Sequence, residues 1–240
     1  VYKAREISLE GDASKVVPAL DFLIASNRKG LGDKVDNFDN GSLNAKGKNV
    51  VVIGGGDTAM DCVRTAIRQE AKSVKCLYRR DKENMPGSAR EVNNAEEEGV
   101  EFLWQSLPKK IESDNNGNLL NCIKMKLSEP DSDGRRTPQE IAGSDFELET
   151  DLVIAALGFS PENLPKMFEV EELPVTKWGT VRVGFNTMMT SLEGVFAAGD
   201  IVRGASLVVW GIRDGRDVAN SIHHYIEEKN NAKNLNTKAS

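Results

Sequence analysis

The chain has 240 residues, with 31 Lys and Arg against 37 Asp and Glu, so its formal net charge is −6. Binding to a nucleic-acid backbone depends on cationic side chains that neutralise phosphates, so this acidic chain is a poor candidate for a nucleic-acid-binding protein. With 39% hydrophobic and 28% charged residues, the composition is that of a folded globular protein. The longest apolar runs, residues 50–53 and 152–157, are far shorter than the roughly 20 residues of a membrane-spanning helix.

The first residues, Val1–Arg5, contain no apolar core of a secretion signal, so we expect a cytoplasmic protein that contacts no membrane. The three cysteines are an odd number at wide spacings, which suits neither a disulfide framework nor a zinc or iron–sulfur site. His223 and His224 are the only histidines, and adjacent helical side chains point in different directions. We therefore predict no metal-binding residue.

The sequence signal for secondary structure is weak before residue 49 and clear from there on. Residues 16–24 are amphipathic, and residues 26–44 are a polar run typical of a loop. Residues 49–53 form a β-branched run, as expected for a strand buried on both faces of a parallel sheet. After a glycine-rich turn, apolar residues recur at helical spacing at Ala59, Cys62, Val63, Ala66 and Ile67.

A second strand and helix follow directly. Residues 73–78 predict a strand that ends at a pair of arginines. Ser88 and Glu91 have the spacing of a capping box, and Gly99 is placed to end the helix that they begin. Residues 100–104 predict a third strand, which completes a β-α-β-α-β unit.

The remaining sequence predicts a meander and a fourth buried strand. Residues 111–150 show short strands with turns at 114–118 and 131–134, typical of a β-meander. Residues 152–157 form an apolar strand that ends at Gly158.

The last predicted unit is a strand over residues 194–200, followed by a helix. One face of that helix has apolar or small residues at positions 208, 211, 212, 215, 218, 219, 222 and 226. This strand ends at Gly199 and Asp200, where the Asp200 carboxylate could accept a sugar-type hydroxyl and the helix start could donate N–H groups. The alternative is that Asp200 only caps a turn.

The turn Gly54-x-Gly56-x-x-Ala59 between a strand and a helix is the arrangement that a dinucleotide-binding fold requires. Gly54 permits the tight turn, Gly56 lets a pyrophosphate approach the backbone, and Ala59 lets the helix pack near the sheet. The alternative is a glycine-rich turn without a ligand.

The end of the second strand indicates which nicotinamide cofactor is preferred. An acidic residue there would bind the ribose 2′-OH and favour NAD. This chain has Arg79 and Arg80, with Asp81 only after them, and guanidinium groups suit a 2′-phosphate. The sequence therefore favours NADPH, unless an arginine merely pairs with Asp81 or Glu83 on a solvated loop.

Several motifs together resemble the small (β) subunits of NADPH-dependent glutamate synthases. The motifs are GGGDTAMDCVRT at 54–65, YRRD at 78–81, NMPGS at 84–88, ALGF at 156–159 and AGDIVRG at 198–204. They occur in the family's order over nearly the whole chain. The resemblance implies the α/β fold of two-dinucleotide-domain flavoprotein reductases, with a Rossmann-like NADPH domain and its β-meander inserted in a partial FAD-binding domain.

The resemblance also implies domain limits and site residues. Residues 1–44 would be a connector and remnant of the FAD domain, 45–160 the NADPH domain and 161–240 the C-terminal part of the FAD domain. The implied cofactor-binding residues are Gly54, Gly55, Gly56, Asp57, Thr58, Ala59, Arg79 and Arg80 for NADPH, Gly199, Asp200, Leu207 and Val208 for FAD, and Gly158 without a specified cofactor. No catalytic side chain is expected, because hydride transfer depends on positioning the cofactors.

In the intact enzyme, the resemblance implies that electrons pass from NADPH to FAD and through iron–sulfur clusters to a large subunit, which forms glutamate from glutamine and 2-oxoglutarate. The family's iron–sulfur cysteines and second glycine turn lie upstream of the part seen here, so the FAD site is expected to be only partly present. Glu70 also departs from the family, which commonly has glycine at that helix end. The alternatives are an electron-input module of another NADPH:ferredoxin or dihydropyrimidine dehydrogenase-like enzyme, or a non-catalytic dinucleotide-binding module.

Overall fold

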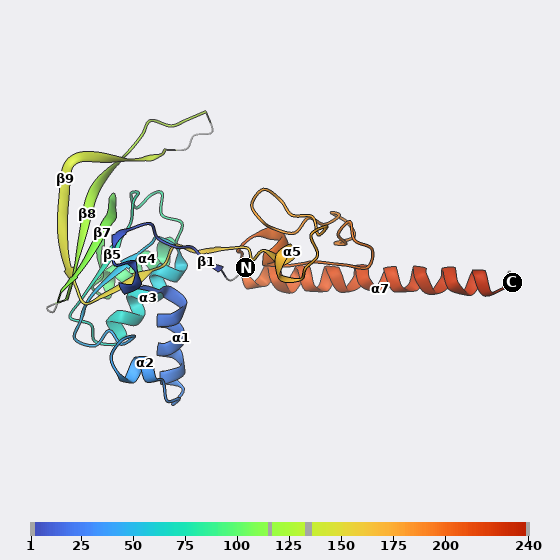
Figure 1. Ribbon diagram of the computed structural model, residues 1–240, viewed down its shortest axis with the longest axis horizontal. Helices are drawn as coiled ribbons and strands as arrows, with labels where there is room; N and C mark the ends of the chain where they lie inside the picture. The colour runs from blue at the N-terminus through green and yellow to red at the C-terminus, as the bar shows by residue number, and fades with distance from the viewer. Residues whose placement is uncertain (1–2, 115–116, 133–135, 239–240) are drawn as a thin grey trace. The chain divides into compact units, whose positions relative to one another are not determined.

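The computed structural model in Figure 1 describes residues 3–114, 117–132 and 136–238. Contacts divide the chain into two compact units, one of Glu6–Gly158 and the other of Val1–Arg5 with Phe159–Ser240. Residues 6–44 pack within the larger unit, and the expected domain limits at residues 44 and 160 stay predictions.

A five-stranded parallel sheet with the order β3-β10-β4-β5-β6 forms the centre of the larger unit. Its strands are β3 (Val16–Pro18), β10 (Leu152–Ala155), β4 (Asn49–Ile53), β5 (Ser73–Leu77) and β6 (Glu101–Leu103). The predicted β-α-β-α-β unit is confirmed, with α3 (Asp57–Arg68) and α4 (Ala89–Glu97) as its helices. The sequence missed β3, because three residues ending in proline are too short to show a strand pattern.

Both faces of this sheet are buried, which explains the unbroken β-branched run of β4. Alternate residues point to opposite faces, so Val50 and Val52 pack with the helices while Val51 and Ile53 pack on the other side. The helical face is covered by α1 (Ala19–Gly30), α3 and α4. The short α2 (Asp36–Asp39) follows α1 (Figure 1).

The opposite face is covered by a second sheet, which confirms the predicted β-meander (Figure 1). The prediction of short strands is wrong, because the three meander strands have 9, 11 and 13 residues. Its order is β2-β7-β8-β9, with β2 (Glu10–Gly11), β7 (Ser106–Asp114), β8 (Gly117–Leu127) and β9 (Pro138–Thr150). A single 3-10 turn, Ala13–Lys15, lies between β2 and β3. The two turns predicted at 114–118 and 131–134 lie partly outside the described residues.

The capping box predicted at the start of α4 is wrong, because its hydrogen bonds are not formed. Ser88 is the residue before the helix, but its side chain makes no capping hydrogen bond. Glu91 instead pairs with Arg64 of α3, which also donates to Glu98 at 2.7 and 2.9 Å. A charged partner on the neighbouring helix outcompetes the local cap. Gly99 ends the helix as predicted, with a φ of +97°.

In the smaller unit, β1 (Lys3–Ala4) pairs antiparallel with β11 (Phe159–Ser160), and three helices follow. They are α5 (Leu164–Met167), α6 (Asp200–Arg203) and α7 (Val208–Lys238). The strand predicted over residues 194–200 is not formed. Phe196 makes only an isolated bridge to Met189, and a strand needs a neighbour to satisfy its backbone.

The face of α7 that has the apolar and small residues is largely exposed. Val208, Ile212 and Ile226 are 77%, 62% and 50% exposed, whereas Asp214 is buried at 5%. The polar residue is buried because its carboxylate is paired, and the apolar face has no partner within the described residues.

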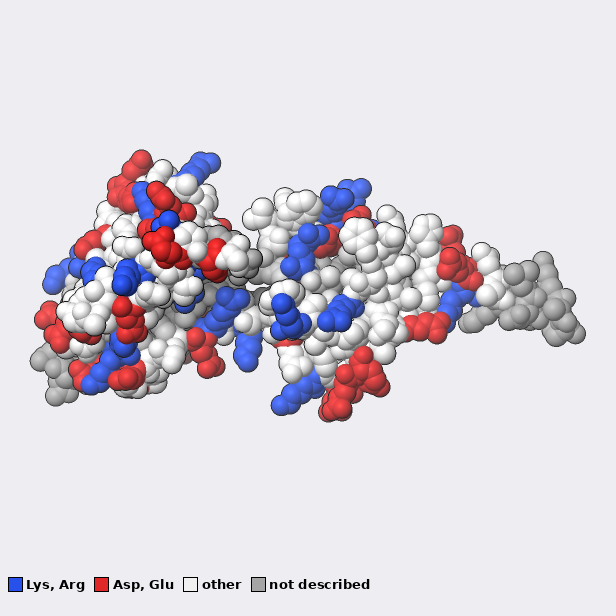
Figure 2. Space-filling view, turned by 90° about the horizontal axis from the view of Figure 1, so that it is seen from above, with Lys and Arg blue, Asp and Glu red and all other residues white. Residues whose placement is uncertain are grey.

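No helix in the described part of the chain is both long and apolar enough to cross a bilayer. On the face that Figure 2 shows, acidic and basic side chains are interspersed, and neither the acidic nor the basic residues form a continuous patch.

Candidate dinucleotide-binding site

Three strands of the parallel sheet end at the same edge. Ile53 of β4 lies beside Leu77 of β5 on one side and Ala155 of β10 on the other. The residues that follow these strands, including the glycine-rich turn and the two arginines, therefore emerge side by side. Ligands of parallel α/β sheets bind at this carboxyl edge.

The three consecutive glycines differ in what the fold requires of them. Gly54 has a φ of +147°, and a Cβ there would lie 2.2 Å from the carbonyl oxygen of Ala156. A Cβ on Gly55 would lie 2.5 Å from the ring of Tyr78. A Cβ on Gly56 would meet no atom within 4 Å, and its φ of −93° is ordinary. The fold therefore requires the first two glycines but leaves the third open to a ligand.

The start of α3 can donate to an anion. The first hydrogen bonds into this helix come from the amides of Ala59 and Met60, both to the carbonyl oxygen of Gly56. The amides of Asp57 and Thr58 precede them, and amides in the first turn of a helix have no intrahelical acceptor. Ala59 is fully buried against the sheet, as predicted.

The two arginines lie just beyond β5. Arg79 is exposed and Arg80 is half-buried, and the Arg80 Nε is a buried donor without a partner. Within the described residues, neither guanidinium pairs with Asp81 or Glu83. Asp81 instead accepts from the backbone and side-chain nitrogens of Asn84, at 2.9 and 2.7 Å. An unpaired buried donor costs about 1–3 kcal/mol, so an anionic ligand would be favoured there.

Asp57 makes a contact that the sequence did not predict. Its Oδ1 accepts a hydrogen bond from the backbone N–H of Ser88 at 2.8 Å. Tyr78 is a second residue that the prediction missed, since its ring fills the space over Gly55 and its hydroxyl donates to the Asn84 carbonyl at 2.9 Å. Burial raises the pKa of the Tyr78 phenol. No sequence signal identifies either contact, because one joins residues 31 apart and the other is a packing relation.

Gly158 follows β10 and has a φ of +80°, with open space around its Cβ position. The larger unit therefore contains Gly158 together with the eight residues predicted for the pyridine nucleotide.

The four residues predicted for the flavin lie in the smaller unit. Gly199 has a φ of +74° and immediately precedes Asp200 at the start of α6. Leu207 and Val208 are exposed at the start of α7, where the first helical bond runs from the Trp210 amide to the Leu207 carbonyl at 2.9 Å. The amide of Val208 is therefore available to a ligand.

Asp214 of α7 stabilises this turn. It accepts two bonds from the Arg203 guanidinium, at 3.0 and 2.6 Å, and one from the Gly199 backbone. The guanidinium holds the pKa of the Asp214 carboxyl below its usual value. The sequence missed this residue because its position in the helical pattern gives no signal for burial.

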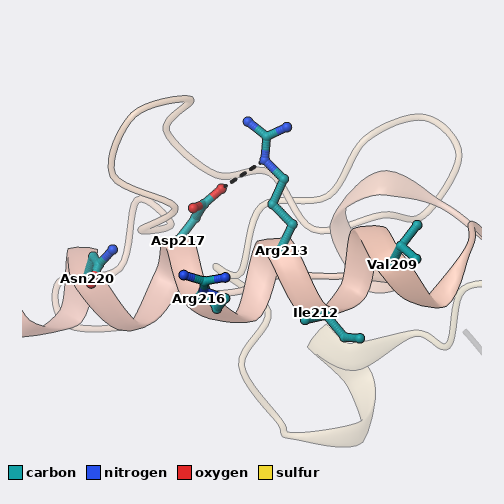
Figure 3. A pocket seen from close by; sticks show the side chains of 6 residues that line it. All are labelled: Val209, Ile212, Arg213, Arg216, Asp217 and Asn220. Atoms are coloured by element: carbon teal, nitrogen blue, oxygen red, sulfur yellow. Dashed lines mark ion pairs between the residues drawn. The ribbon is translucent and has the colours of Figure 1, made fainter.

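One hollow in the smaller unit is lined by residues of α7 alone. It is lined by Val209, Ile212, Arg213, Arg216, Asp217 and Asn220 (Figure 3). Arg213 and Asp217 form an ion pair across one helical turn at 3.6 Å. The hollow lies on the helix whose first residues were predicted to contact the flavin.

The paired histidines of α7 are engaged locally. His223 Nε2 lies 3.2 Å from Glu227, and His224 Nδ1 lies 3.8 Å from the same carboxylate. Among the residues that the structure describes, no group of three or more His, Cys, Asp or Glu side chains could hold a metal ion.

Comparison with known proteins places these features in a family. The chain is 60% identical over 230 residues to the glutamate synthase [NADPH] small chain of Azospirillum brasilense, covering 95% of this chain and 48% of that protein. It is 44% identical over 232 residues to the corresponding small chain of Escherichia coli, covering 94% of this chain and 49% of that protein. These similarities confirm the resemblance drawn from the motifs, and the chain spans about half the length of these curated relatives.

Among solved structures, Mycobacterium tuberculosis FprA in complex with NADPH has a TM-score of 0.69 and 16% sequence identity. The match covers 97% of this chain and 63% of that one, which shows a shared fold. The family pattern described as pyridine nucleotide-disulphide oxidoreductase matches residues 4–219. The chain therefore belongs to the pyridine nucleotide-disulphide oxidoreductase family.

Proposed function

We propose that the larger unit binds NADPH and that the chain is the electron-input part of a flavin-dependent oxidoreductase. The observation that carries the proposal is the open space at Gly56 beside the start of α3, with the unpartnered Arg80 Nε at the end of the next strand. An anion cradle and a guanidinium at neighbouring strand ends suit the pyrophosphate and the 2′-phosphate of one NADPH molecule. The complex of the structural neighbour FprA with NADPH supports this assignment.

In this proposal, the residues of the chain bind and orient the two cofactors. The first amides of α3 would hold the pyrophosphate, with Arg79 and Arg80 on the 2′-phosphate. In the smaller unit, the Asp200 carboxylate would accept a hydrogen bond from a hydroxyl of FAD, and the backbone at Leu207 and Val208 would lie near the flavin. The chemistry that these cofactors supply when bound is hydride transfer from dihydronicotinamide to flavin. We assign no acid or base, because this transfer depends on positioning.

The flavin site is proposed to need residues beyond those of this chain. The apolar face of α7 supports this, because Ile212 is 62% exposed and Ile226 is 50% exposed. Apolar faces of this kind normally pack against another element.

The cofactor assignment is tested by calorimetric titration of the chain with NADPH and with NADH. Arg79→Gln and Arg80→Gln, singly and together, are compared with Arg136→Gln, which removes the same charge from an exposed site in the same unit. We expect the double variant to lose roughly tenfold to a hundredfold in NADPH affinity, while NADH affinity changes by less than about twofold. The control should match the wild-type chain. Equal losses for both nucleotides would contradict the 2′-phosphate assignment.

We further propose that the electrons pass through iron–sulfur clusters outside this chain to a large subunit, which forms glutamate from glutamine and 2-oxoglutarate. Similarity to two glutamate synthase small chains supports this role. The test is a chimera in which this chain replaces the matching half of the Azospirillum brasilense small chain. NADPH-dependent glutamate formation with that organism's large subunit is expected, and a folded, NADPH-oxidising chimera that forms no glutamate would favour another electron acceptor.

A further inference from the structure

The loop between β5 and α4, residues 81–88, lies against the glycine-rich turn, and we call it the strap. Two hydrogen bonds join them. The Gly87 amide donates to the Gly55 carbonyl at 2.8 Å, and the Ser88 amide donates to the Asp57 carboxylate at 2.8 Å. The strap therefore contacts the very backbone that the proposed pyrophosphate site uses.

The strap is also held at its other end. The Tyr78 hydroxyl donates to the Asn84 carbonyl, and Asp81 holds the Asn84 amide. Met85 packs against the core on the helical face of the sheet. The strap begins directly after Arg79 and Arg80. The backbone of this pair is also held by the Ser106 amide, which donates to the Tyr78 carbonyl at 3.0 Å, and by the Gln105 amide, which donates to the Arg80 carbonyl at 2.9 Å. The strap therefore contributes one of the two attachments of the backbone that carries the guanidiniums.

A carboxylate at the start of α3 requires an explanation. It is favoured by the helix dipole, but it places a negative charge where the proposed ligand is an anion. The hydrogen bond from Ser88 turns the Asp57 carboxylate toward the strap. The Ser88 side chain makes no capping bond, so the backbone donor alone forms this tie.

We propose that Asp57 is a positioning residue that couples the two halves of the nucleotide site through the Ser88 amide. This inference rests on the proposed NADPH function. By holding the strap on the glycine-rich turn, Asp57 keeps the start of α3 and the arginines beyond β5 in one fixed arrangement. NADPH affinity and the preference for NADPH over NADH then depend on a side chain that acts through the strap.

Four variants of the full chain separate this role from others. Asp57→Ala removes the acceptor, while Asp57→Asn keeps an oxygen acceptor and removes only the charge. Ser88→Pro removes the N–H donor, and the Ser88 φ of −56° already suits proline. Ser88→Ala is the matched control, because it keeps the donor and removes only the hydroxyl.

Calorimetric binding of NADPH and NADH is measured for each variant, with thermal unfolding as the readout for folding. We expect Asp57→Ala and Ser88→Pro each to lower NADPH affinity roughly five- to fiftyfold and to reduce the NADPH preference, and their combination to add little further. Asp57→Asn should rescue most of the affinity, and Ser88→Ala should retain it.

Different failures have different meanings. A wild-type chain that binds no NADPH overturns the proposed function itself. A wild-type chain that binds NADPH, with Asp57→Ala retaining both affinity and preference, overturns only the coupling role. Equal losses for Asp57→Asn and Asp57→Ala, or additive losses in the double variant, would also overturn it, because they indicate a charge effect or two independent effects. If Ser88→Pro does not fold, the two Asp57 variants still decide the question.

Discussion

Gly56→Ala should separate the requirements of the fold from those of the ligand. A Cβ at this position meets no atom within 4 Å, and the φ of −93° and ψ of 178° are accessible to alanine. Alanine is a poorer residue than glycine before a helix, by up to about 1 kcal/mol. It also restricts the unfolded chain, which offsets about 0.4–1 kcal/mol. The net change in the free energy of unfolding should therefore lie within about 1 kcal/mol.

Gly54→Ala is the matched contrast, because the same methyl group is added two residues earlier. The φ of +147° carries a backbone strain of about 1–3 kcal/mol for a residue with a Cβ. The new Cβ would lie 2.2 Å from the Ala156 carbonyl oxygen, and relief of that overlap costs about 1–3 kcal/mol more. We expect a total loss of roughly 2–6 kcal/mol.

The assay combines thermal unfolding without ligand and calorimetric titration with NADPH. Gly56→Ala should shift Tm by no more than about 2–4 °C and yet weaken NADPH binding at least tenfold, equivalent to about 1.4 kcal/mol. Gly54→Ala should lower Tm well beyond that range. Unchanged affinity in Gly56→Ala would refute the view that its open space receives the pyrophosphate. Equal destabilisation by the two substitutions would refute the structural distinction between the glycines.

Three further predictions concern stability and reactivity. Glu70 ends α3 with a φ of +61°, so Glu70→Gly should relieve backbone strain and raise Tm by a few degrees, whereas Glu70→Ala should not. Burial raises the pKa of Cys76 and Cys122 to about 12, so at pH 8 a thiol reagent should label them only after unfolding; rapid labelling of the folded chain would contradict their burial. The Arg203 guanidinium lowers the pKa of Asp214, so the charged carboxylate stabilises the fold above the unfolded pKa of about 3.9, and this contribution is lost as pH falls through the folded pKa. Thermal unfolding of Asp214→Asn should therefore show a lower Tm than wild type at pH 7, with a difference that narrows below about pH 4; a constant difference would exclude this titration as the cause.

The local sequence predicted the central elements because their patterns reflect local burial. The β-branched run of β4 and the helical spacing of α3 identified a strand buried on both faces and the helix after it. The motif also placed Gly54, Gly56 and Ala59 correctly at the end of the strand and the start of the helix. The sequence also showed Glu70 at a position where the family commonly has glycine, and the backbone there has the positive φ that favours glycine.

What the sequence could not determine were contacts between segments that are distant along the chain. The spacing of Ser88 and Glu91 predicted a capping box. Instead, Glu91 forms an ion pair with Arg64 on another helix, and the Ser88 amide donates a hydrogen bond to Asp57. The strand predicted before Gly199 did not form, since strand formation depends on a hydrogen-bonding neighbour that no local pattern specifies. Periodicity shows which residues of a segment share a face, and it therefore gave the strand and helix of the glycine-rich turn. Which surface meets that face is decided by tertiary packing, and so only the three-dimensional structure placed the strap on the turn and left the apolar face of α7 exposed.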